Sequence, residues 1–255
     1  MDEEENRDLV KDKILQLIKE NNYEVDEEIE FFVEQLNDAL KAKKENNDVD
    51  SIIEWLNKKR QDYPVKTDEI GLKQLEKWHI DENSGNVYHD SGKFFSVMGV
   101  KVGGADDREV PSWTQPMIKQ QECGILGILC KKINGTMHYL LQAKYEPGNT
   151  RTLQLSPTLQ ATESNLKQAH QGKKPLLAEY FEDSAKGKVI ISVVSVEDGG
   201  RFYLKTNRNM IVEVSEDEEI NAPDSFIWVN LYQLKKLLKK DLEVNSLVRS
   251  ILGSM

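Results

Sequence analysis

The 255-residue sequence lacks the short motifs that most directly assign an activity. It contains no GxxxxGKS or GxxxxGKT phosphate loop, no GxGxxG segment between a strand and a helix, and no GxSxG nucleophile turn. These absences exclude a P-loop nucleotide hydrolase, a dinucleotide-dependent dehydrogenase of the usual type and a serine hydrolase of the α/β class. The four histidines show no metal-ligand spacing; they are His79, His89, His138 and His170.

The sequence also has little cysteine and too little basic charge to balance its acidic residues. Cys123 and Cys130 are seven residues apart with no CxxC spacing, which predicts free thiols in a reducing compartment. The net charge of −10 argues against a nucleic-acid or anionic-membrane partner. No apolar run reaches transmembrane length, and Met1–Glu5 lacks the basic and apolar regions of a signal peptide. We therefore expect a soluble cytoplasmic protein.

Apolar residues at helical spacing mark the first quarter of the chain. Residues 7–62 hold three apolar stripes, with Asp50 as the expected N-cap of the third helix and Pro64 just beyond its end. We predict a helical module over residues 1–65 that packs on the main domain or on a second subunit. The stripes are Val10, Ile14, Leu17 and Ile18; Ile29, Phe32, Val33, Leu36 and Leu40; and Ile52, Ile53 and Leu56.

Beyond about Lys66 the apolar period becomes that of β-strands. Asn134–Gly135, between two apolar runs, is a strong hairpin signal, and Asn230 is the expected N-cap of a helix near the C-terminus. Mixed, mostly antiparallel strands with terminal helices indicate an α+β domain over residues 66–255. The expected strands are 94–102, 124–131, 138–144, 153–162, 189–196 and 210–214.

The segment Thr152–Thr162 alternates between apolar and polar residues without a single charge. Because 31% of the chain is charged, an ordinary strand facing solvent should contain Lys or Glu. A face made only of hydroxyls and amides suits a pocket that orients a ligand by neutral hydrogen bonds. The polar face comprises Gln154, Ser156, Thr158, Gln160 and Thr162, opposite Leu153, Leu155, Leu159 and Ala161.

The strand before it combines a base and an acid on one face. Gln142, Lys144 and Glu146 alternate with Tyr145 and its apolar neighbours. In an enclosed site such a pair can shift each other's pKa and transfer protons; in an open one it is an ion pair of little value. The turn Pro147–Asn149 then directs the chain back toward the uncharged strand, so the two polar faces can line one cavity.

Two further clusters suit recognition of a nucleotide. Trp113 and Gln115 offer an aromatic plane and an amide, although Trp113 can equally be a core residue. Arg201 follows Gly199–Gly200 and can bind a diphosphate, unless the segment is a plain hairpin turn. Arg208 is a second cation for the same anion.

Several of these segments together resemble the NDP-hexose 2,3-dehydratases, enzymes of deoxysugar pathways. The resemblance covers roughly Leu75 to the C-terminus and implies a Nudix-like α+β fold. The glutamate-rich metal helix of Nudix hydrolases is absent from the sequence, so diphosphate hydrolysis is not expected. The matching segments are Trp113–Pro116, Leu141–Asn149, Gln154–Asn165, Gly199–Phe202 and Arg249–Leu252.

The resemblance implies a nucleotide-linked 4-keto-6-deoxyhexose as substrate, with dTDP-4-keto-6-deoxyglucose the most common case. The C4 ketone acidifies the C3 proton, a base removes that proton, donors stabilise the enolate oxygen, and the C2 hydroxyl leaves with help from an acid. The product is a 3,4-diketo-2,6-dideoxy sugar, which a 3-ketoreductase would consume. Such an elimination requires no metal or redox cofactor in principle, and we predict none.

Within this chemistry we assign Glu146 as the base and Lys144 as the acid or enolate stabiliser, with the reverse assignment left open. Tyr145 and His170 are further acid–base candidates, and Trp113, Gln115 and Arg201 are assigned to the nucleotide. The remaining candidates for substrate binding are Gln142, Asn149, Gln154, Ser156, Thr158, Gln160, Thr162, Asn165 and Arg208.

One departure from the family pattern affects the function. Familiar members contain two tandem copies of the module, and this chain contains one. A homodimer whose subunits stand in for the two copies is the simplest consequence. The alternatives are a module that only binds a nucleotide sugar, or a different nucleotide-sugar enzyme such as a ketoisomerase.

Overall fold

The computed structural model describes residues 9–45, 48–104, 107–120, 122–162, 166, 174–182 and 186–255. The larger sheet consists of β5 (Gly124–Ile133), β6 (Thr136–Tyr145), β7 (Leu153–Ser156), β8 (Leu159–Thr162), β9 (Lys188–Val196), β11 (Thr206–Glu213) and β12 (Phe226–Asn230). The smaller sheet consists of β1 (Trp78–Ile80), β2 (Val87–His89), β3 (Ser96–Val102), β4 (Trp113–Lys119) and β10 (Phe202–Tyr203). The helices are α1 (Leu9–Glu20), α2 (Glu27–Glu45), α3 (Asp50–Asp62), α5 (Leu231–Leu237) and α6 (Ser246–Leu252), with short turns η1 (Leu72–Gln74) and η2 (Ala178–Tyr180).

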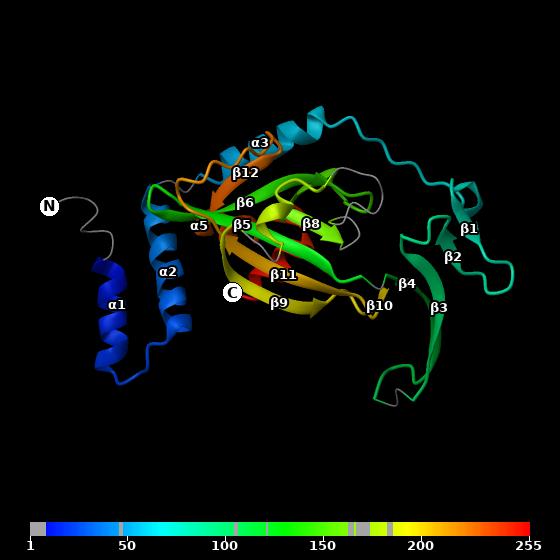
Figure 1. The fold of residues 1–255 in the computed structure, drawn as a ribbon, viewed down its shortest axis with the longest axis horizontal. Helices are drawn as coiled ribbons and strands as arrows, with labels where there is room; N and C mark the ends of the chain where they lie inside the picture. Colours follow the sequence, from blue (N-terminus) through cyan, green and yellow to red (C-terminus); the bar gives the residue numbers. More distant parts are fainter. Residues whose placement is uncertain are drawn as a thin grey trace.

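The two sheets lie side by side, with the α1–α2 hairpin at the opposite end of the molecule from the smaller sheet (Figure 1). The larger sheet has the order β12-β6-β5-β11-β9, with β7 paired to β6 and β8 paired to β5. Among the described strands the pairs are antiparallel apart from β4–β10 and β5–β11, which are parallel. The expected α+β class with mixed, mostly antiparallel strands is confirmed. No helix within the described ranges is long and apolar enough to cross a membrane.

The hairpin signal at Asn134–Gly135 is confirmed. These two residues join β5 to β6 and both have positive φ, 52° and 72°, which is the backbone form that a two-residue hairpin turn requires. Asn230 is confirmed as a helix cap, because its side chain accepts a hydrogen bond from the Gln233 N–H at 2.8 Å. The capping prediction at Asp50 is wrong: the Asp48 carboxylate accepts from the N–H groups of Asp50 and Ser51 instead.

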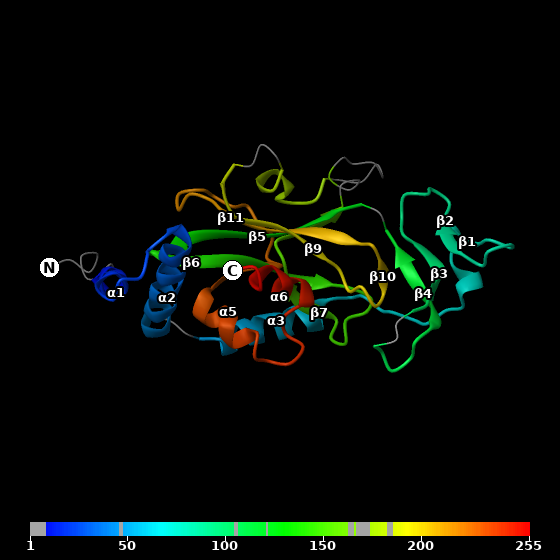
Figure 2. The same cartoon turned by 90° about the horizontal axis from the view of Figure 1, so that it is seen from below.

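Two hydrophobic cores cover opposite faces of the larger sheet (Figure 2). On one face α3, α5 and α6 bury Leu56, Leu234 and Ile251 completely. On the other face the segment around η2 buries Tyr180 and Phe181. Helix α3 therefore packs into the core of the larger sheet. The boundary at residue 65 between a helical module and an α+β domain stays a prediction.

An ion-pair cluster also fastens α3 to the sheet. Glu243 is 5% exposed, and its carboxylate pairs with Arg60 of α3 at 2.8 Å and with Arg151. The Arg60 guanidinium further donates to the Leu153 carbonyl at 2.9 Å. One buried carboxylate thus connects α3, the start of β7 and the segment before α6.

Candidate active site

The expected strand over residues 153–162 is instead two strands with a break at Pro157–Thr158. Leu153 and Leu155 pack into the core beneath α3, whereas Leu159 and Ala161 pack into the core on the opposite face. Because of the break, the polar side chains of β7 and those of β8 point to opposite faces of the sheet. A single uncharged wall is not formed, because only the polar residues of β8 share a face with α6.

Thr158 sits where β5 and β6 separate. The last paired residues of these strands are Leu129 and Leu140, and beyond them β8 pairs with β5 and β7 pairs with β6. The Thr158 hydroxyl accepts from the Leu129 N–H at 2.9 Å and donates to the Leu140 carbonyl at 2.5 Å. Since Thr158 is 2% exposed, its hydroxyl completes the sheet at the fork and does not face a ligand.

Replacing Thr158 with valine should therefore destabilise the fold. The change leaves a buried N–H and a buried carbonyl without their partner, which costs about 2 kcal/mol. Urea unfolding measures the loss, and Thr158→Ser, which keeps the hydroxyl, serves as the control. A valine variant as stable as the parent would contradict this role.

A cavity of about 350 Å³ opens at this end of the larger sheet, between the sheet and the start of α6. Its walls combine neutral hydrogen-bonding groups with two lysines and one glutamate, a composition that suits a polar, uncharged sugar. The polar lining residues are Gln120, Lys144, Gln160, Thr162, Glu197, Lys205 and Asn207; the apolar ones include Leu126, Phe202 and Leu247.

Lys144 points across the fork into this cavity. Its ammonium donates to the Gln160 amide oxygen at 2.6 Å and lies 3.7 Å from the Glu146 carboxylate. Burial lowers the pKa of Lys144, and the nearby charge of Glu146 opposes that shift only partly. A lysine of this kind is deprotonated more readily than one at the surface, so it can both accept and donate a proton.

Glu146 stands behind Lys144, outside the residues that line the cavity. Its carboxylate lies 3.5 Å from the side-chain amide of Asn245, which caps α6 by accepting from the Leu247 N–H at 2.8 Å. Glu146 thus contacts Lys144 on one side and the start of α6 on the other. This position suits a residue that tunes Lys144 more than one that touches substrate.

The opposite wall consists of residues that the sequence analysis missed. Asn207 donates to the Glu197 carboxylate, and a Cβ at position 124 would lie too close to the Asn207 amide oxygen, so any larger residue there would displace this amide. Lys205 is 4% exposed and donates to the Glu122 carbonyl. Burial lowers the pKa of Lys205, with partial opposition from the charge of Glu197.

The residues assigned to the nucleotide form a network beside the cavity. Trp113 donates to the Gln115 amide oxygen at 2.7 Å, and Gln115 donates to the Gly200 carbonyl at 2.7 Å. Arg201, on the same turn, is exposed and pairs with Asp198 at 2.6 Å. This turn begins at Glu197 and ends at Phe202, both cavity residues, so the network adjoins the cavity wall.

Other candidate residues lie away from the cavity. Tyr145 contacts Tyr63 and Thr67 near α3, and Arg208 donates to Ser192 on the face of β11 opposite Asn207. Gln142 and Ser156 are paired in the β6–β7 ladder, Gln154 donates to the Leu242 carbonyl, and Asn149 closes the turn after Glu146. Asn165 and His170 fall outside the described residues.

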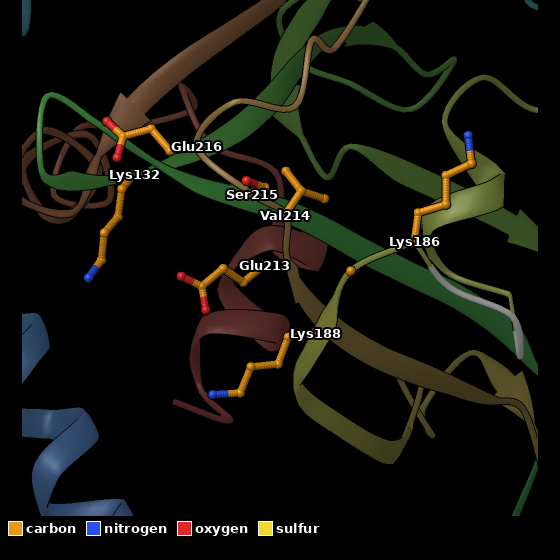
Figure 3. Close-up of a pocket in the computed structure, with 8 residues that line it drawn as sticks. Lys132, Lys186, Lys188, Glu213, Val214, Ser215 and Glu216 are labelled. Atoms are coloured by element: carbon orange, nitrogen blue, oxygen red, sulfur yellow. The ribbon is translucent and has the colours of Figure 1, made fainter.

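A larger, open depression of about 600 Å³ lies at the other end of β11. It contains none of the predicted site residues, and lysine and glutamate side chains are interspersed along its walls (Figure 3). Lys186 points away from Lys132 and Lys188, so the three cations do not converge on one anion. The cavity at Lys144 is the better candidate.

Comparison with known proteins identifies the chain's relatives. A family model described as NDP-hexose 2,3-dehydratase matches residues 49–255. The chain belongs to the NDP-hexose 2,3-dehydratase family. The matched range contains every residue of the cavity, whereas α1 and α2 precede it.

Among curated relatives, the chain is 44% identical over 199 residues to a dTDP-4-dehydro-6-deoxy-α-D-glucopyranose 2,3-dehydratase of Saccharopolyspora spinosa. It is 40% identical over 205 residues to a protein of the same name from Amycolatopsis orientalis. The matches cover 78% and 79% of this chain but only 40% and 43% of those proteins. This member of the family therefore spans less than half the length of the curated relatives that it matches.

Matches among solved structures include an ADP compounds hydrolase and a Nudix hydrolase from M. smegmatis. The first has a TM-score of 0.39 and 16% identity, covering 71% of this chain and 96% of its own. The second has a TM-score of 0.32 and 17% identity, covering 52% of this chain and 88% of its own.

Proposed function

We propose that this chain eliminates the C2 hydroxyl of dTDP-4-keto-6-deoxyglucose, as the names of its curated relatives suggest. The observation that best supports the proposal is Lys144, a partly buried lysine with a lowered pKa on the wall of a cavity lined by neutral hydrogen-bonding groups. Elimination next to a ketone needs a proton acceptor near C3 and a proton donor near C2. The cavity offers both functions on one residue.

In the proposed reaction the neutral amine of Lys144 removes the C3 proton, and the electrons pass into the C4 ketone to give an enolate. The C2–O bond then breaks, and the Lys144 ammonium returns the proton so that the hydroxyl leaves as water. Lys205 stabilises the enolate oxygen, since its ammonium has three donors and Glu122 uses one of them. The resulting enol tautomerises to the 3,4-diketo sugar.

Neutral side chains hold the sugar in this proposal. Gln160, Thr162 and Asn207 present amides and a hydroxyl to the cavity, and these groups suit the sugar oxygens. The nucleotide lies over the adjoining turn, with Arg201 near the diphosphate and Trp113 available for stacking on the base. Such positioning places C2 and C3 at Lys144.

The proposal also includes a second subunit, a downstream enzyme and a cellular compartment. A homodimer would supply the second module that the longer relatives have room for, and a 3-ketoreductase would consume the diketone product. No metal or redox cofactor is included in the proposal. The cytoplasm is the proposed compartment, in keeping with the free thiols of Cys123 and Cys130.

Proton NMR in deuterated buffer tests the activity. The chain, incubated with dTDP-4-keto-6-deoxyglucose, should exchange the C3 proton for deuterium and lose the C2 hydroxyl. Exchange without loss of the hydroxyl would indicate a ketoisomerase. Tight binding of dTDP with neither change would indicate a module that only binds nucleotide sugars.

The pH profile of the Glu146→Gln variant separates the two possible bases. The negative charge of Glu146 raises the pKa of Lys144, so its removal should lower that pKa further. If neutral Lys144 is the base, the rise of kcat/KM with pH should move to lower pH while substantial activity remains. If Glu146 is the base, as the sequence analysis favoured, activity should be lost at every pH.

A further inference from the structure

Helix α2 has two apolar faces, of which only one is covered by the rest of the chain. The inner face buries Val33 and Ala42, and the Asp38 carboxylate accepts from the Met137 N–H at 3.2 Å, which fixes the helix to β6. Helix α1 approaches on another side, where Lys11 pairs with Glu34 at 3.5 Å. The remaining face carries large apolar side chains that these contacts leave in solvent.

That outer face is a single row of residues spaced by four. Phe32, Leu36 and Leu40 are 42%, 50% and 47% exposed. The row continues with exposed Glu28 at the N-terminal end and exposed Lys44 at the C-terminal end. We call these five residues the α2 row. They span about 24 Å along the helix axis, with an acid at one end, three apolar groups in the middle and a base at the other end.

We propose that the α2 row is the contact through which two copies of this chain dimerise, with the two rows running antiparallel about a two-fold axis at Leu36. Rows of residues spaced by four interdigitate when helices cross at about −50°, the commonest packing of helices in globular proteins. In that arrangement the two rows are closest at their centre, where the two Leu36 side chains meet, and each row turns away from the crossing point by about 40° for every step of four residues. The long side chains of Glu28 of one subunit and Lys44 of the other then lie on the same side of the crossing, where they can reach each other.

The charge pattern favours a second copy over an unrelated partner. A two-fold interface must be complementary to itself, and the α2 row meets this condition only when antiparallel. The charges also agree with the helix dipole, since acids gather in the first turn of α2 and lysines in the last. Parallel pairing would instead place Glu28 against Glu28 and Lys44 against Lys44.

The predicted dimer is reversible. One helix row on each subunit contributes less than the roughly 1,200 Å² typical of stable interfaces, so dissociation in the micromolar range is expected. The α2 row identifies a surface for the homodimer proposed above, and it is independent of the proposed elimination. The cavity at Lys144 is lined in part by residues of β8 and β10, and these two strands lie away from the α1–α2 hairpin (Figure 1).

Sedimentation equilibrium on the full chain over micromolar concentrations tests the surface. The parent should show a monomer–dimer equilibrium, and Leu36→Glu should raise its dissociation constant by ~100-fold. Because Leu36 is exposed, the variant should keep its circular dichroism spectrum. Leu72→Glu, an equal change at an exposed leucine in η1, is the matched control and should leave the equilibrium unchanged. A parent that stays monomeric, or a dimer that Leu36→Glu leaves intact, overturns the proposal.

A charge exchange tests the antiparallel arrangement. Glu28→Lys alone and Lys44→Glu alone should each weaken the dimer, because each places like charges together at both ends of the interface. The double variant, Glu28→Lys with Lys44→Glu, restores opposite charges and should recover the parent dissociation constant. Failure of the double variant to recover overturns this pairing. Turnover by the charge variants is measured in parallel, so that loss of dimer and loss of elimination are distinguished.

Discussion

Replacing Lys144 with methionine should lower kcat by about 10²- to 10⁴-fold, the usual contribution of a positioned acid–base group. Methionine keeps the length and apolar stem of the side chain but cannot transfer a proton. In the proposed reaction the same nitrogen takes the C3 proton and returns it to the leaving hydroxyl. The variant should therefore lose both C3 deuterium exchange and dehydration, which NMR follows in one sample.

For Lys144→Met, a loss of the chemical step must be distinguished from a loss of substrate binding. The network of Trp113, Gln115 and Arg201, which we propose to bind the nucleotide, does not involve Lys144, so the affinity for dTDP should change little when measured by calorimetry. Lys239→Met, at an exposed lysine just beyond α5, is the matched control and should turn over normally. A Lys144→Met variant that exchanges the C3 proton at the parent rate would remove Lys144 from the mechanism.

The features that the sequence predicted well are local ones. The turn at Asn134–Gly135 depends on two residues that tolerate positive φ, and the cap at Asn230 depends on a side chain and an N–H three residues apart. Both signals are complete within a few residues, so no tertiary information is needed to recognise them. Such signals locate a helix cap only to within about two residues: the capping side chain is Asp48, two residues before the expected Asp50.

The uncharged segment at residues 153–162 shows where local pattern fails. Its odd-numbered residues are apolar throughout, which predicts one continuous strand with one buried face. The break at Pro157–Thr158 sends Leu155 and Leu159 to opposite faces of the sheet. Apolar residues are buried on both faces here, so alternation alone cannot reveal that the face has changed. Thr158 consequently belongs to the sheet, whereas Gln160 reaches the cavity.

The opposite wall of the cavity depends on long-range pairing. Asn207 on β11 lies beside Gly124 on β5 through a parallel register that joins segments more than eighty residues apart. The charge of Arg208 makes it the expected ligand-binding residue of this segment. Adjacent residues on a strand face opposite sides, so the cavity receives Asn207, and Arg208 reaches Ser192 instead.

The second large predicted effect is on stability, and it concerns the buried carboxylate of Glu243. Its two arginine partners come from α3 and from the segment before β7, and they converge on one side chain that is 6% exposed. The ion pair between Lys59 and Asp224 also joins α3 to the main domain. The Asp224 side chain, however, is 90% exposed to solvent. Water screens that second pair, so the two contacts should differ greatly in their effect on stability.

Glu243→Gln should lower the free energy of unfolding by about 3 to 5 kcal/mol, the usual cost of removing one member of a buried charge cluster. The substitution keeps the volume of the side chain but leaves the Arg60 guanidinium, which is 11% exposed, without its counter-charge. Urea unfolding should show a lower midpoint with an unchanged slope, since the folded core is the same. Asp224→Asn removes a carboxylate that also faces α3 and should shift the midpoint only slightly. If the two variants unfold at the same urea concentration, Glu243 does not hold α3 to the sheet, and the attachment rests on the other contacts of α3, such as those of the buried Ile52 and Leu56.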